Sequence, residues 1–370
     1  MEKSPRYPGH VVWLLVLFLS LAACHSTHSG NEMNFHPMEE EYVKRFGRTF
    51  LHKSQALDLI SAGSGIAFET ESKLVKIDLL SVQASHAYVA IQVNGDEVER
   101  FKVRRQVSTV TLTLDGTPAQ VRVVKDTEAI AGSIRVAGVW ADGSISRAPK
   151  NGKLIEFIGN SITSAMGADL AIPCDTGQWF DQHRGSLSYG AQIADSLSAD
   201  YLLNSVSGYG VYRNWNDENV AEPTLPQVYE NLYLNQDSTV KYQPKRLPDL
   251  ISICLGTNDL SAGDGTKPRR PFDRQKFVST FRAFVQKLYE RDPEVKIILV
   301  MSPMVTGEKE KMLEESLQQI RHSFAERQVI EVFKFSNVRP AGCTGHPTVK
   351  EHQEMATQLL PLVHSLLYPS

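Results

Sequence analysis

The periodicity of the hydrophobic residues changes near residue 150, and this change constrains the fold more than any other feature of the sequence. Before it, short runs alternate apolar and polar residues, with turn signals between the runs. After it, short apolar runs are separated by longer segments in which apolar residues recur every three or four positions. The first pattern is typical of half-buried strands, and the second is typical of buried strands joined by amphipathic helices. We therefore predict two domains of different architecture.

The first domain is predicted to be built from strands alone. Asn94-Gly95 and Asp115-Gly116 each follow a run rich in β-branched residues, and both dipeptides are strong hairpin signals. No helical pattern lies between the runs, which indicates a β-sandwich of the jelly-roll type over residues 41–145. The expected strands are 74–80, 87–93, 97–103, 108–114 and 119–125.

The second domain, expected over residues 153–370, has the pattern of an α/β sheet. Segment 272–291 has helical spacing and stands between two apolar runs, so we expect a parallel sheet covered on both faces. The stretch 141–153 is the natural linker. In such sheets ligands bind at the carboxyl ends of the strands, where loops lead into helices. The expected strands are 153–159, 201–206, 249–256, 295–303 and 329–335.

The composition argues against one class of function. Of the 370 residues, 42% are hydrophobic and 22% are charged, as in an ordinary globular protein, and the net charge is −3. Binding to nucleic acid usually needs a broad basic surface. We therefore expect no nucleic-acid partner.

The N-terminus has the layout of an export signal. Lys3 and Arg6 precede an apolar run that ends in LAAC at 21–24, and this run is short for a membrane-spanning helix. LAAC resembles the bacterial lipobox, which implies a signal peptide over 1–23, a lipid on Cys24 and a tether over 24–40. The protein would then be anchored to a membrane on its periplasmic or cell-surface face. The alternative is a plain cleaved signal with an incidental cysteine.

The three remaining cysteines do not form a complete disulfide framework, because their number is odd. Cys254 stands in an apolar run and is expected to be a small core residue. Cys174 and Cys343 can pair in an oxidising compartment, but the sequence leaves this open. No two cysteines have the close spacing of a zinc site, so no metal is expected.

Ser161 is the first candidate for chemistry. It lies in GNSIT at 159–163, where the first strand of the second domain turns into what we expect to be a helix through SAMG at 164–167. Backbone N–H groups and a helix N-terminus beside such a serine can stabilise the negative charge of acyl transfer. The alternative is a helix N-cap serine without a catalytic role.

Three more residues follow at successive expected loops of the same domain. Gly208 in NSVSGYG lets the backbone approach a ligand, and Asn258 in GTND offers a short amide donor. Either can instead be an ordinary turn residue. His346 in GCTGHPTV precedes a final helix and is the expected general base, whereas His183 and His352 stand at no expected strand end.

Ser, Gly, Asn and His in this order resemble the four sequence blocks of the SGNH, or GDSL-like, hydrolase superfamily. The resemblance implies a three-layer α/β/α fold with Ser161 as nucleophile and His346 as base. It also implies an oxyanion hole made of the Ser161 and Gly208 backbone amides and the Asn258 side chain. The chain further resembles carbohydrate esterase family 2, in which a jelly-roll domain precedes an SGNH domain, in the segments AGSGIAF at 62–68, VNGDEV at 93–98, KLIEFIGNSIT at 153–163, GYGVYRNW at 208–215 and LGTND at 255–259.

The sequence departs from these relatives just before the histidine. The superfamily usually has an Asp three residues earlier, where this chain has Cys343, and family 2 often has an Asp-aromatic pair where this chain has Thr344-Gly345. We therefore expect a Ser-His dyad in which a backbone carbonyl orients His346. A carbonyl can fix the tautomer of the imidazole, but it stabilises the imidazolium less than a carboxylate does.

Six residues in the loops after the first two blocks are candidates for sugar binding. Aromatic faces can pack on sugar rings, and Arg or Asn side chains can orient hydroxyl groups, although such residues often serve packing instead. The six are Trp179, Tyr209, Tyr212, Arg213, Asn214 and Trp215.

The resemblance implies an esterase that removes acetyl groups from plant-type polysaccharides or oligosaccharides such as xylan, mannan or glucomannan. Acyl transfer of this kind needs no metal or organic cofactor. No protein partner is expected. The alternatives are a lipase or thioesterase that acts on long acyl chains, and a glycan-binding lipoprotein whose SGNH domain has weak activity.

Overall fold

The structure is a computed structural model that describes residues 32–149, 152–218, 222–324 and 328–369. The expected signal peptide at 1–23 and the expected lipid site at Cys24 lie outside the described residues. Within the described ranges, no helix is both long enough and apolar enough to cross a membrane.

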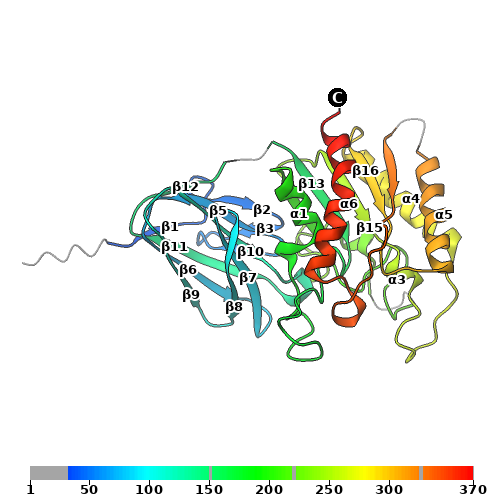
Figure 1. Ribbon diagram of the computed structural model, residues 1–370, viewed down its shortest axis with the longest axis horizontal. Coiled ribbons are helices and arrows are strands. Elements are labelled where there is room, and N and C mark those ends of the chain that lie inside the picture. Colours follow the sequence, from blue (N-terminus) through cyan, green and yellow to red (C-terminus); the bar gives the residue numbers. More distant parts are fainter. Residues whose placement is uncertain (1–31, 150–151, 219–221, 325–327, 370) are drawn as a thin grey trace, which may run out of the picture. The chain divides into compact units, whose positions relative to one another are not determined.

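The first domain consists of two antiparallel six-stranded sheets (Figure 1). The first sheet has the order β3-β4-β11-β6-β9, with β1 paired to β11; its strands are β1 (Asn34–His36), β3 (Thr49–Leu51), β4 (Leu57–Leu59), β6 (Leu74–Ser81), β9 (Ser108–Thr113) and β11 (Ile134–Ala141). The second sheet has the order β12-β5-β10-β7-β8, with β2 paired to β5; its strands are β2 (Lys44–Phe46), β5 (Gly65–Thr70), β7 (His86–Val93), β8 (Asp96–Arg104), β10 (Ala119–Lys125) and β12 (Ile145–Arg147). The predicted β-sandwich is confirmed.

Period-two alternation explains how the sandwich closes. In β6, Val75, Ile77 and Leu79 are fully buried, whereas the residues between them are partly exposed. The buried residues pack against those of the second sheet, such as Val89 and Ile91, in one hydrophobic cluster. The pattern visible in the sequence is therefore the pattern of burial.

The N-terminal tether predicted over 24–40 was too long. Residues 34–36 form β1, which pairs with β11 of the sandwich, and Met38 is fully buried in the sandwich core. The predicted end of the domain at residue 145 was also early, because β12 pairs with β5. Both segments are too short to show a strand periodicity of their own, and their strand state depends on partners far away in the sequence.

The second domain is a parallel five-stranded sheet with helices on both faces, as predicted (Figure 1). The sheet has the order β14-β13-β15-β16-β17; its strands are β13 (Leu154–Gly159), β14 (Asp200–Ser205), β15 (Leu250–Cys254), β16 (Lys296–Val300) and β17 (Ile330–Phe333). Its helices are α1 (Tyr189–Ser196), α2 (Leu225–Val228), α3 (Thr257–Leu260), α4 (Arg274–Arg291), α5 (Glu308–His322) and α6 (Val349–Leu367), and its short 3₁₀ turns are η2 (Gly185–Leu187) and η3 (Cys343–Gly345). Another 3₁₀ turn, η1 (Ala129–Ala131), lies between β10 and β11 of the first domain.

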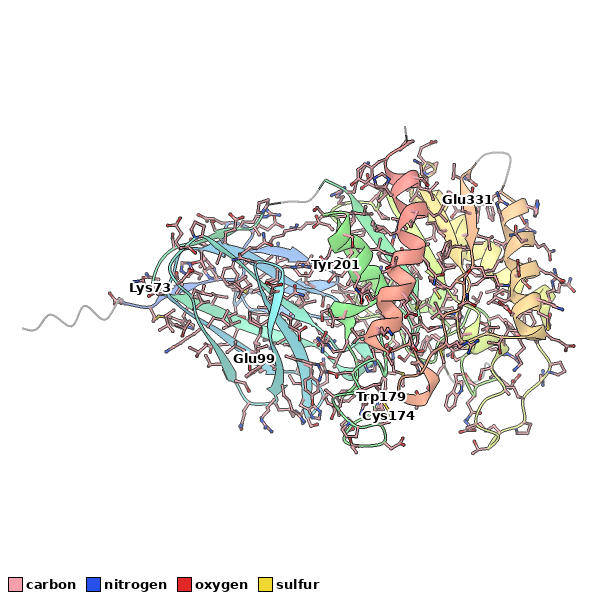
Figure 2. All side chains as sticks on the ribbon, viewed as in Figure 1. Lys73, Glu99, Cys174, Trp179, Tyr201 and Glu331 are labelled. Atoms are coloured by element: carbon pink, nitrogen blue, oxygen red, sulfur yellow. A yellow bond between two sulfur atoms is a disulfide. The ribbon has the colours of Figure 1, made fainter. Side chains whose placement is uncertain are left out.

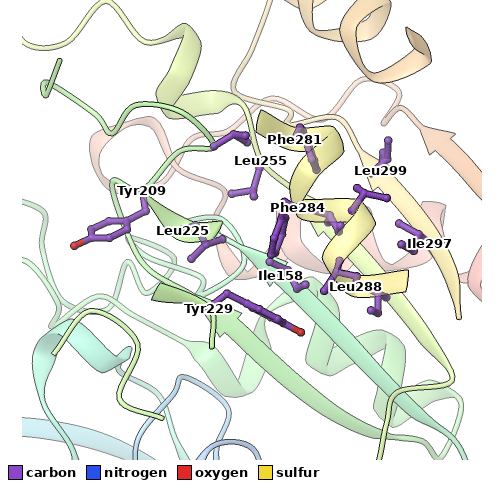
Figure 3. Packing of buried hydrophobic residues seen from close by; sticks show 14 of the residues in the cluster. Ile158, Tyr209, Leu225, Tyr229, Leu255, Phe281, Phe284, Leu288, Ile297 and Leu299 are labelled. Carbon is purple, nitrogen blue, oxygen red and sulfur yellow. The ribbon is translucent and has the colours of Figure 1, made fainter. Parts of the chain in front are cut away.

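Each face of the parallel sheet has its own hydrophobic core. On one face, Ile158 of β13 packs with residues of α4 such as Phe281 and Phe284 (Figure 3). On the other face, Phe157 packs with residues of α1 and α6, including Tyr189. Because neighbouring residues of a strand point to opposite faces, one apolar run serves both cores. Cys254 is buried and carries a free thiol, as predicted.

Buried polar contacts join the sandwich to the α/β domain. Arg48, in the turn between β2 and β3, is fully buried and donates to Asn204 Oδ1 at 2.5 Å. It also donates to the carbonyl oxygens of Tyr229 at 2.6 Å and Asn231 at 2.5 Å. Its guanidinium carbon lies 4.2 Å from the ring centroid of Tyr242. One cation from the sandwich therefore satisfies three buried acceptors of the other domain.

We predict that Arg48→Met lowers the free energy of unfolding by about 3 kcal/mol, because two buried acceptors lose their donor and the Asn231 carbonyl oxygen loses one of its two donors. The midpoint of urea denaturation, followed by tryptophan fluorescence, measures the change. The matched control is Arg274→Met, whose pair with Glu315 is exposed and which should cost less than about 0.5 kcal/mol. Equal midpoints for the two variants would contradict the role given to Arg48.

Candidate active site

The order of the strands places the predicted site residues at one edge of the sheet. β13 lies between β14 and β15, and all three run parallel. Ser161 follows the carboxyl end of β13, Gly208 follows that of β14, and Asn258 lies in α3 just after β15. The carboxyl ends of parallel neighbours meet at the same edge. The nucleophile candidate is thus flanked on either side by the two other donor candidates.

Ser161 lies in a series of tight turns and not at the start of the helix expected through 164–167. The amide of Met166 donates to the Ser161 carbonyl oxygen at 2.9 Å, but the turns do not continue as a helix. Ala165 and Gly167 have φ angles of 53° and 69°, which are left-handed and interrupt a right-handed helix. The predicted helix was therefore wrong, and the local backbone amides, without a helix dipole, remain as the stabilising groups.

His346 contacts Ser161 directly. Its Nε2 lies 2.8 Å from Ser161 Oγ, and both side chains are largely buried. For Nε2 to accept the serine proton, the imidazole proton must lie on Nδ1. That nitrogen lies 3.2 Å from the carbonyl oxygen of Cys343 and 2.9 Å from Thr344 Oγ1, and Thr344 Oγ1 itself donates to the Cys343 oxygen at 2.7 Å. The surroundings of Nδ1 thus favour the tautomer that a general base requires.

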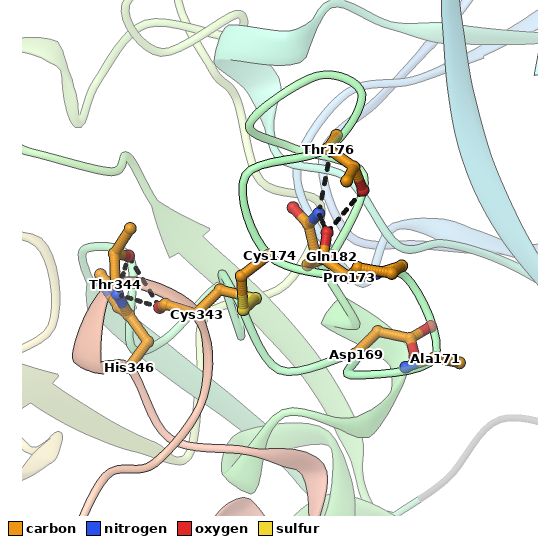
Figure 4. Close-up of a disulfide and its surroundings, with 9 residues drawn as sticks. All are labelled: Asp169, Ala171, Pro173, Cys174, Thr176, Gln182, Cys343, Thr344 and His346. Carbon is orange, nitrogen blue, oxygen red and sulfur yellow. Dashed lines mark hydrogen bonds between the residues drawn. A yellow bond between two sulfur atoms is a disulfide. The ribbon is translucent and has the colours of Figure 1, made fainter.

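The segment that orients His346 is fixed covalently as well as by hydrogen bonds (Figure 4). Cys343 forms a disulfide with Cys174, which answers the question that the sequence left open. The amide of Cys343 also donates to the carbonyl oxygen of Gly167 at 3.0 Å, on the turn that follows the serine. A Cβ on Gly167 would lie 2.6 Å from the Cys343 oxygen, so only glycine fits there. The serine turn and the histidine turn are therefore fastened to each other.

No carboxylate of the described residues hydrogen-bonds to His346. Two acidic residues that could have paired with His346 have other partners. Asp259 accepts the amides of Val211 and Tyr212 at 3.0 and 2.9 Å. Glu351 accepts the amide of Thr348 at 2.8 Å. The place that an acid usually takes at Nδ1 is held by a carbonyl and a hydroxyl group. The Ser-His dyad stays a prediction, and this geometry agrees with it.

Burial lowers the pKa of His346 to about 4. The hydrogen bond to the Cys343 carbonyl and the charge of Glu128 oppose this effect, and His183 adds to it. The imidazole is therefore neutral and able to accept a proton at any pH well above 4.

Two backbone amides and one side-chain amide remain available for an oxyanion. In the described part of the chain, neither Ser161 N–H nor Gly208 N–H donates to a protein acceptor. Asn258 Nδ2 donates one of its two hydrogens to the Tyr209 carbonyl oxygen at 2.8 Å, which leaves the other hydrogen free. Gly208 has a φ of 80°, a conformation that glycine adopts without strain.

Asp259 shapes the loop that follows Gly208, a role that sequence reasoning missed. Its buried carboxylate accepts the amides of residues 211–213, although burial raises its pKa to about 6. The sequence contains a sign of this role, because Asp259 directly follows Asn258. A carboxylate beside the donor asparagine thus holds the neighbouring loop in place.

Four of the six predicted sugar contacts need correction. Arg213 is buried and donates to the Asp259 carbonyl oxygen at 2.6 and 2.8 Å, and Asn214 Oδ1 accepts the amide of Gly210 at 3.1 Å. Tyr209 and Tyr212 are buried in the hydrophobic core. Their polar atoms and rings are used within the protein, so these residues support the loop and do not face a sugar.

Trp179 and Trp215 remain as exposed aromatic residues, with 43% and 46% of their surface accessible. The amide of Trp215 donates to the Gly208 carbonyl oxygen at 2.7 Å, so this residue is next to Gly208 in the fold. Trp179 lies on the same loop as Cys174 (Figure 2) and packs edge-on against His183 at 5.2 Å between ring centroids. Both rings are on loops that are joined directly to the site.

The other two histidines have different surroundings. His352 is fully buried in α6, its Nδ1 accepts the amide of Tyr189 at 3.2 Å, and burial lowers its pKa to about 3. His183 is also fully buried, and its Nε2 lies 3.2 Å from Glu128 Oε1. Neither forms a hydrogen bond to a serine hydroxyl group in the described residues. Across those residues, no cluster of His, Cys, Asp and Glu has a metal-binding arrangement.

A buried serine paired with a histidine, beside free amides at the carboxyl edge of a parallel sheet, defines a serine hydrolase of the α/β/α type. Residues 157–360 match the GDSL-like Lipase/Acylhydrolase family, and residues 45–149 match the carbohydrate esterase 2 N-terminal domain. The chain belongs to the GDSL-like lipase/acylhydrolase family and is an enzyme of the serine esterase type.

Curated proteins and solved structures are similar to this chain. An acetylxylan esterase / glucomannan deacetylase from Cellvibrio japonicus (strain Ueda107) is 28% identical over 247 residues, which are 65% of this chain and 68% of the relative. A family two carbohydrate esterase from Cellvibrio japonicus has the same fold, with a TM-score of 0.81 at 20% identity over 91% of this chain and 98% of that chain. A family two carbohydrate esterase from Clostridium thermocellum, solved with cellohexaose, superposes with a TM-score of 0.78 at 22% identity over 88% and 99%.

We predict that kcat/KM for 4-nitrophenyl acetate falls with acid only below about pH 5, with a midpoint near about 4, the pKa to which burial lowers His346. The base must be neutral, so activity is lost as the pH drops through this pKa and is constant above it. Enzyme returned from pH 4 to pH 7 should regain full activity, which separates titration from unfolding. A midpoint at about 6.5, the ordinary value for histidine, would contradict the buried setting of His346.

Proposed function

We propose that the protein is a carbohydrate O-acetylesterase that releases acetate from acetylated plant-type polysaccharides or oligosaccharides such as xylan, mannan or glucomannan. The observation that carries the proposal is the 2.8 Å contact between His346 Nε2 and Ser161 Oγ beside the free amides of Ser161 and Gly208. The relatives, an acetylxylan esterase / glucomannan deacetylase and family two carbohydrate esterases, support the substrate class.

The reaction proceeds by two acyl transfers. His346 Nε2 accepts the proton of Ser161 Oγ while that oxygen attacks the acetyl carbonyl carbon. The amides of Ser161, Gly208 and Asn258 hold the tetrahedral oxyanion. His346 then gives its proton to the departing sugar oxygen, which leaves the acetyl group on Ser161. Water then attacks the acetyl-enzyme as His346 accepts its proton, and His346 returns that proton to Ser161 Oγ as acetate leaves.

The exposed rings of Trp179 and Trp215 are the proposed contacts for the sugar. Each stands on a loop that also supports the site, the first through Cys174 and the second through Gly208. An aromatic face gives apolar contact to a sugar ring without a charge, which suits a neutral polysaccharide.

We predict that the protein releases acetate from at least one of acetylated xylan, mannan and glucomannan, and that Ser161→Ala releases none, because the acceptor of the acyl group is gone. Acetate measured after incubation with each polysaccharide tests this. Activity on 4-nitrophenyl esters should fall sharply beyond acetate or propionate. Rising activity with chain length would favour a lipase or thioesterase, and glycan binding without acetate release would favour a binding protein.

We also propose that the protein is exported and anchored to a membrane through a lipid on Cys24. The support is the LAAC motif at 21–24 that follows a charged and then an apolar segment.

We predict that bacterial cells expressing the full chain incorporate radiolabelled palmitate into this protein and that Cys24→Ala abolishes the incorporation. The matched control is Cys254→Ala, which removes a buried thiol and should leave labelling unchanged. Label that persists in the Cys24 variant would contradict the anchor.

A further inference from the structure

One carboxylate of the sandwich domain contacts two segments of the catalytic domain. Glu128, between β10 and η1, is fully buried. Its Oε2 accepts the amide of Ser207 at 2.7 Å, and its Oε1 lies 3.2 Å from His183 Nε2. A carboxylate only accepts, so His183 Nε2 carries the proton. The sequence patterns of the two domains did not predict this contact, because residues 128 and 207 lie in different domains.

The position of Glu128 is set by its own domain. Lys125 Nζ is fully buried and donates to the carbonyl oxygens of Ile60, Thr127 and Glu128 at 3.0, 2.5 and 2.9 Å. Burial lowers the pKa of Lys125 to about 7. Three bonds from one side chain thus fix the backbone that carries Glu128, and the carboxylate reaches the catalytic domain from a rigid base.

The residue that Glu128 holds directly precedes the oxyanion glycine. Ser207 donates its amide to Glu128, and the next peptide group is that of Gly208. The other side of the loop is held by the bond from Asn258 Nδ2 to the Tyr209 carbonyl oxygen. Glycine at position 208 has a φ of 80° and is conformationally free, so restraints on both neighbours determine where its N–H points.

We propose that Glu128 is a positioning residue for the oxyanion hole: the sandwich domain completes the active site by fixing the Ser207-Gly208 peptide through this carboxylate. The inference rests on the proposed acyl-transfer function, in which Gly208 N–H stabilises the oxyanion. Preorganised donors cost no reorganisation when the charge develops, whereas a loop free to rotate loses part of that benefit.

The charge of Glu128 supports the same site. It opposes the effect of burial on the pKa of His346, which has no carboxylate partner of its own. The other titratable groups that act on His346 are His183 and, in α6, His352. Because the imidazolium forms in each acyl-transfer step, a nearby buried negative charge favours it without a hydrogen bond.

The test compares Glu128→Ala with Glu128→Gln in the full chain. Glutamine keeps an oxygen that can accept the Ser207 amide but carries no charge, whereas alanine removes both. Active sites are counted with a fluorophosphonate probe, and kcat, KM and the rate of Ser161 labelling are measured per counted site. This normalisation removes any effect of misfolded protein.

We expect Glu128→Ala to lower kcat per site and the labelling rate by about 10- to 100-fold, with KM changed by less than about threefold, because only transition-state stabilisation is lost. Asn258→Ala removes one oxyanion donor and should lower kcat by a factor on the order of 10²–10³, which gives the scale for comparison. Glu128→Gln should recover most of the loss at pH 7, and the acid limb of its rate profile should move to lower pH.

The control for a purely structural effect is Asp58→Asn. Asp58 is a buried carboxylate of the sandwich that pairs with Arg135 and His52, so its loss destabilises the same domain. Its kcat per site should equal that of the wild type. The proposal is overturned if Glu128→Ala keeps wild-type kcat per site, if Glu128→Gln is no better than Glu128→Ala, or if Asp58→Asn loses as much.

Failure of the proposed function gives a different result. A protein that releases no acetate from any acetylated glycan, yet whose Ser161 labelling depends on Glu128 as described, would contradict the substrate class and support the positioning role. A wild-type protein that takes no label at Ser161 would overturn both.

Discussion

The hydrogen bond that Ser161 Oγ donates to His346 Nε2 depends on a backbone carbonyl that is held in place by covalent and polar contacts. The Cys343 oxygen accepts the Nδ1 proton, and Cys343 is itself fixed by the disulfide to Cys174 and by the bond from its amide to Gly167. A carbonyl on a mobile turn would orient an imidazole poorly. Cys343 stands where related enzymes have an Asp. It therefore orients His346 through its carbonyl oxygen and fixes the turn through its disulfide.

A carbonyl fixes a tautomer but contributes no charge, and the structure compensates at a distance. Glu128 is buried near the site and acts on His346 through space, while its oxygens bind Ser207 and His183. In the low dielectric of a buried site such a charge acts over several ångströms. The sandwich domain thus contributes to the electrostatics of the catalytic domain, and Arg48 contributes buried hydrogen bonds across the same interface.

The architecture could be predicted because each half of the chain has a strong periodicity of its own. In β6, apolar and polar residues alternate along the sequence and are alternately buried and partly exposed in the structure. In β13 and β15, a largely apolar run is buried throughout. The helix predicted after Ser161 does not form, because Ala165 and Gly167 are left-handed and the carbonyl oxygen of Gly167 is bound by the amide of Cys343, which is far away in the sequence. Short strands such as β1 were not predicted for a similar reason, because the strand that β1 pairs with lies far away in the sequence.

The site could be predicted in part. Ser161, Gly208, Asn258 and His346 each follow a recognisable strand or precede a helix, so their order along the chain indicated a common edge. Arg213 and Asn214 have the chemistry of sugar ligands, but their direction is set by Asp259 and by the backbone of Gly210, which the sequence does not show. Glu128 lies in the other domain, and no motif in the sequence around it indicates a role in the site.

The central claim is that Ser161 carries the acyl group between the two transfers. Acid quenching during turnover of 4-nitrophenyl acetate, followed by mass spectrometry of the digested protein, tests it most directly. We expect one acetyl group, on the peptide that contains Ser161, and none on the same peptide of the His346→Ala variant. An acetyl group on another residue, or turnover with no acetylated peptide at any quench time, would contradict the account.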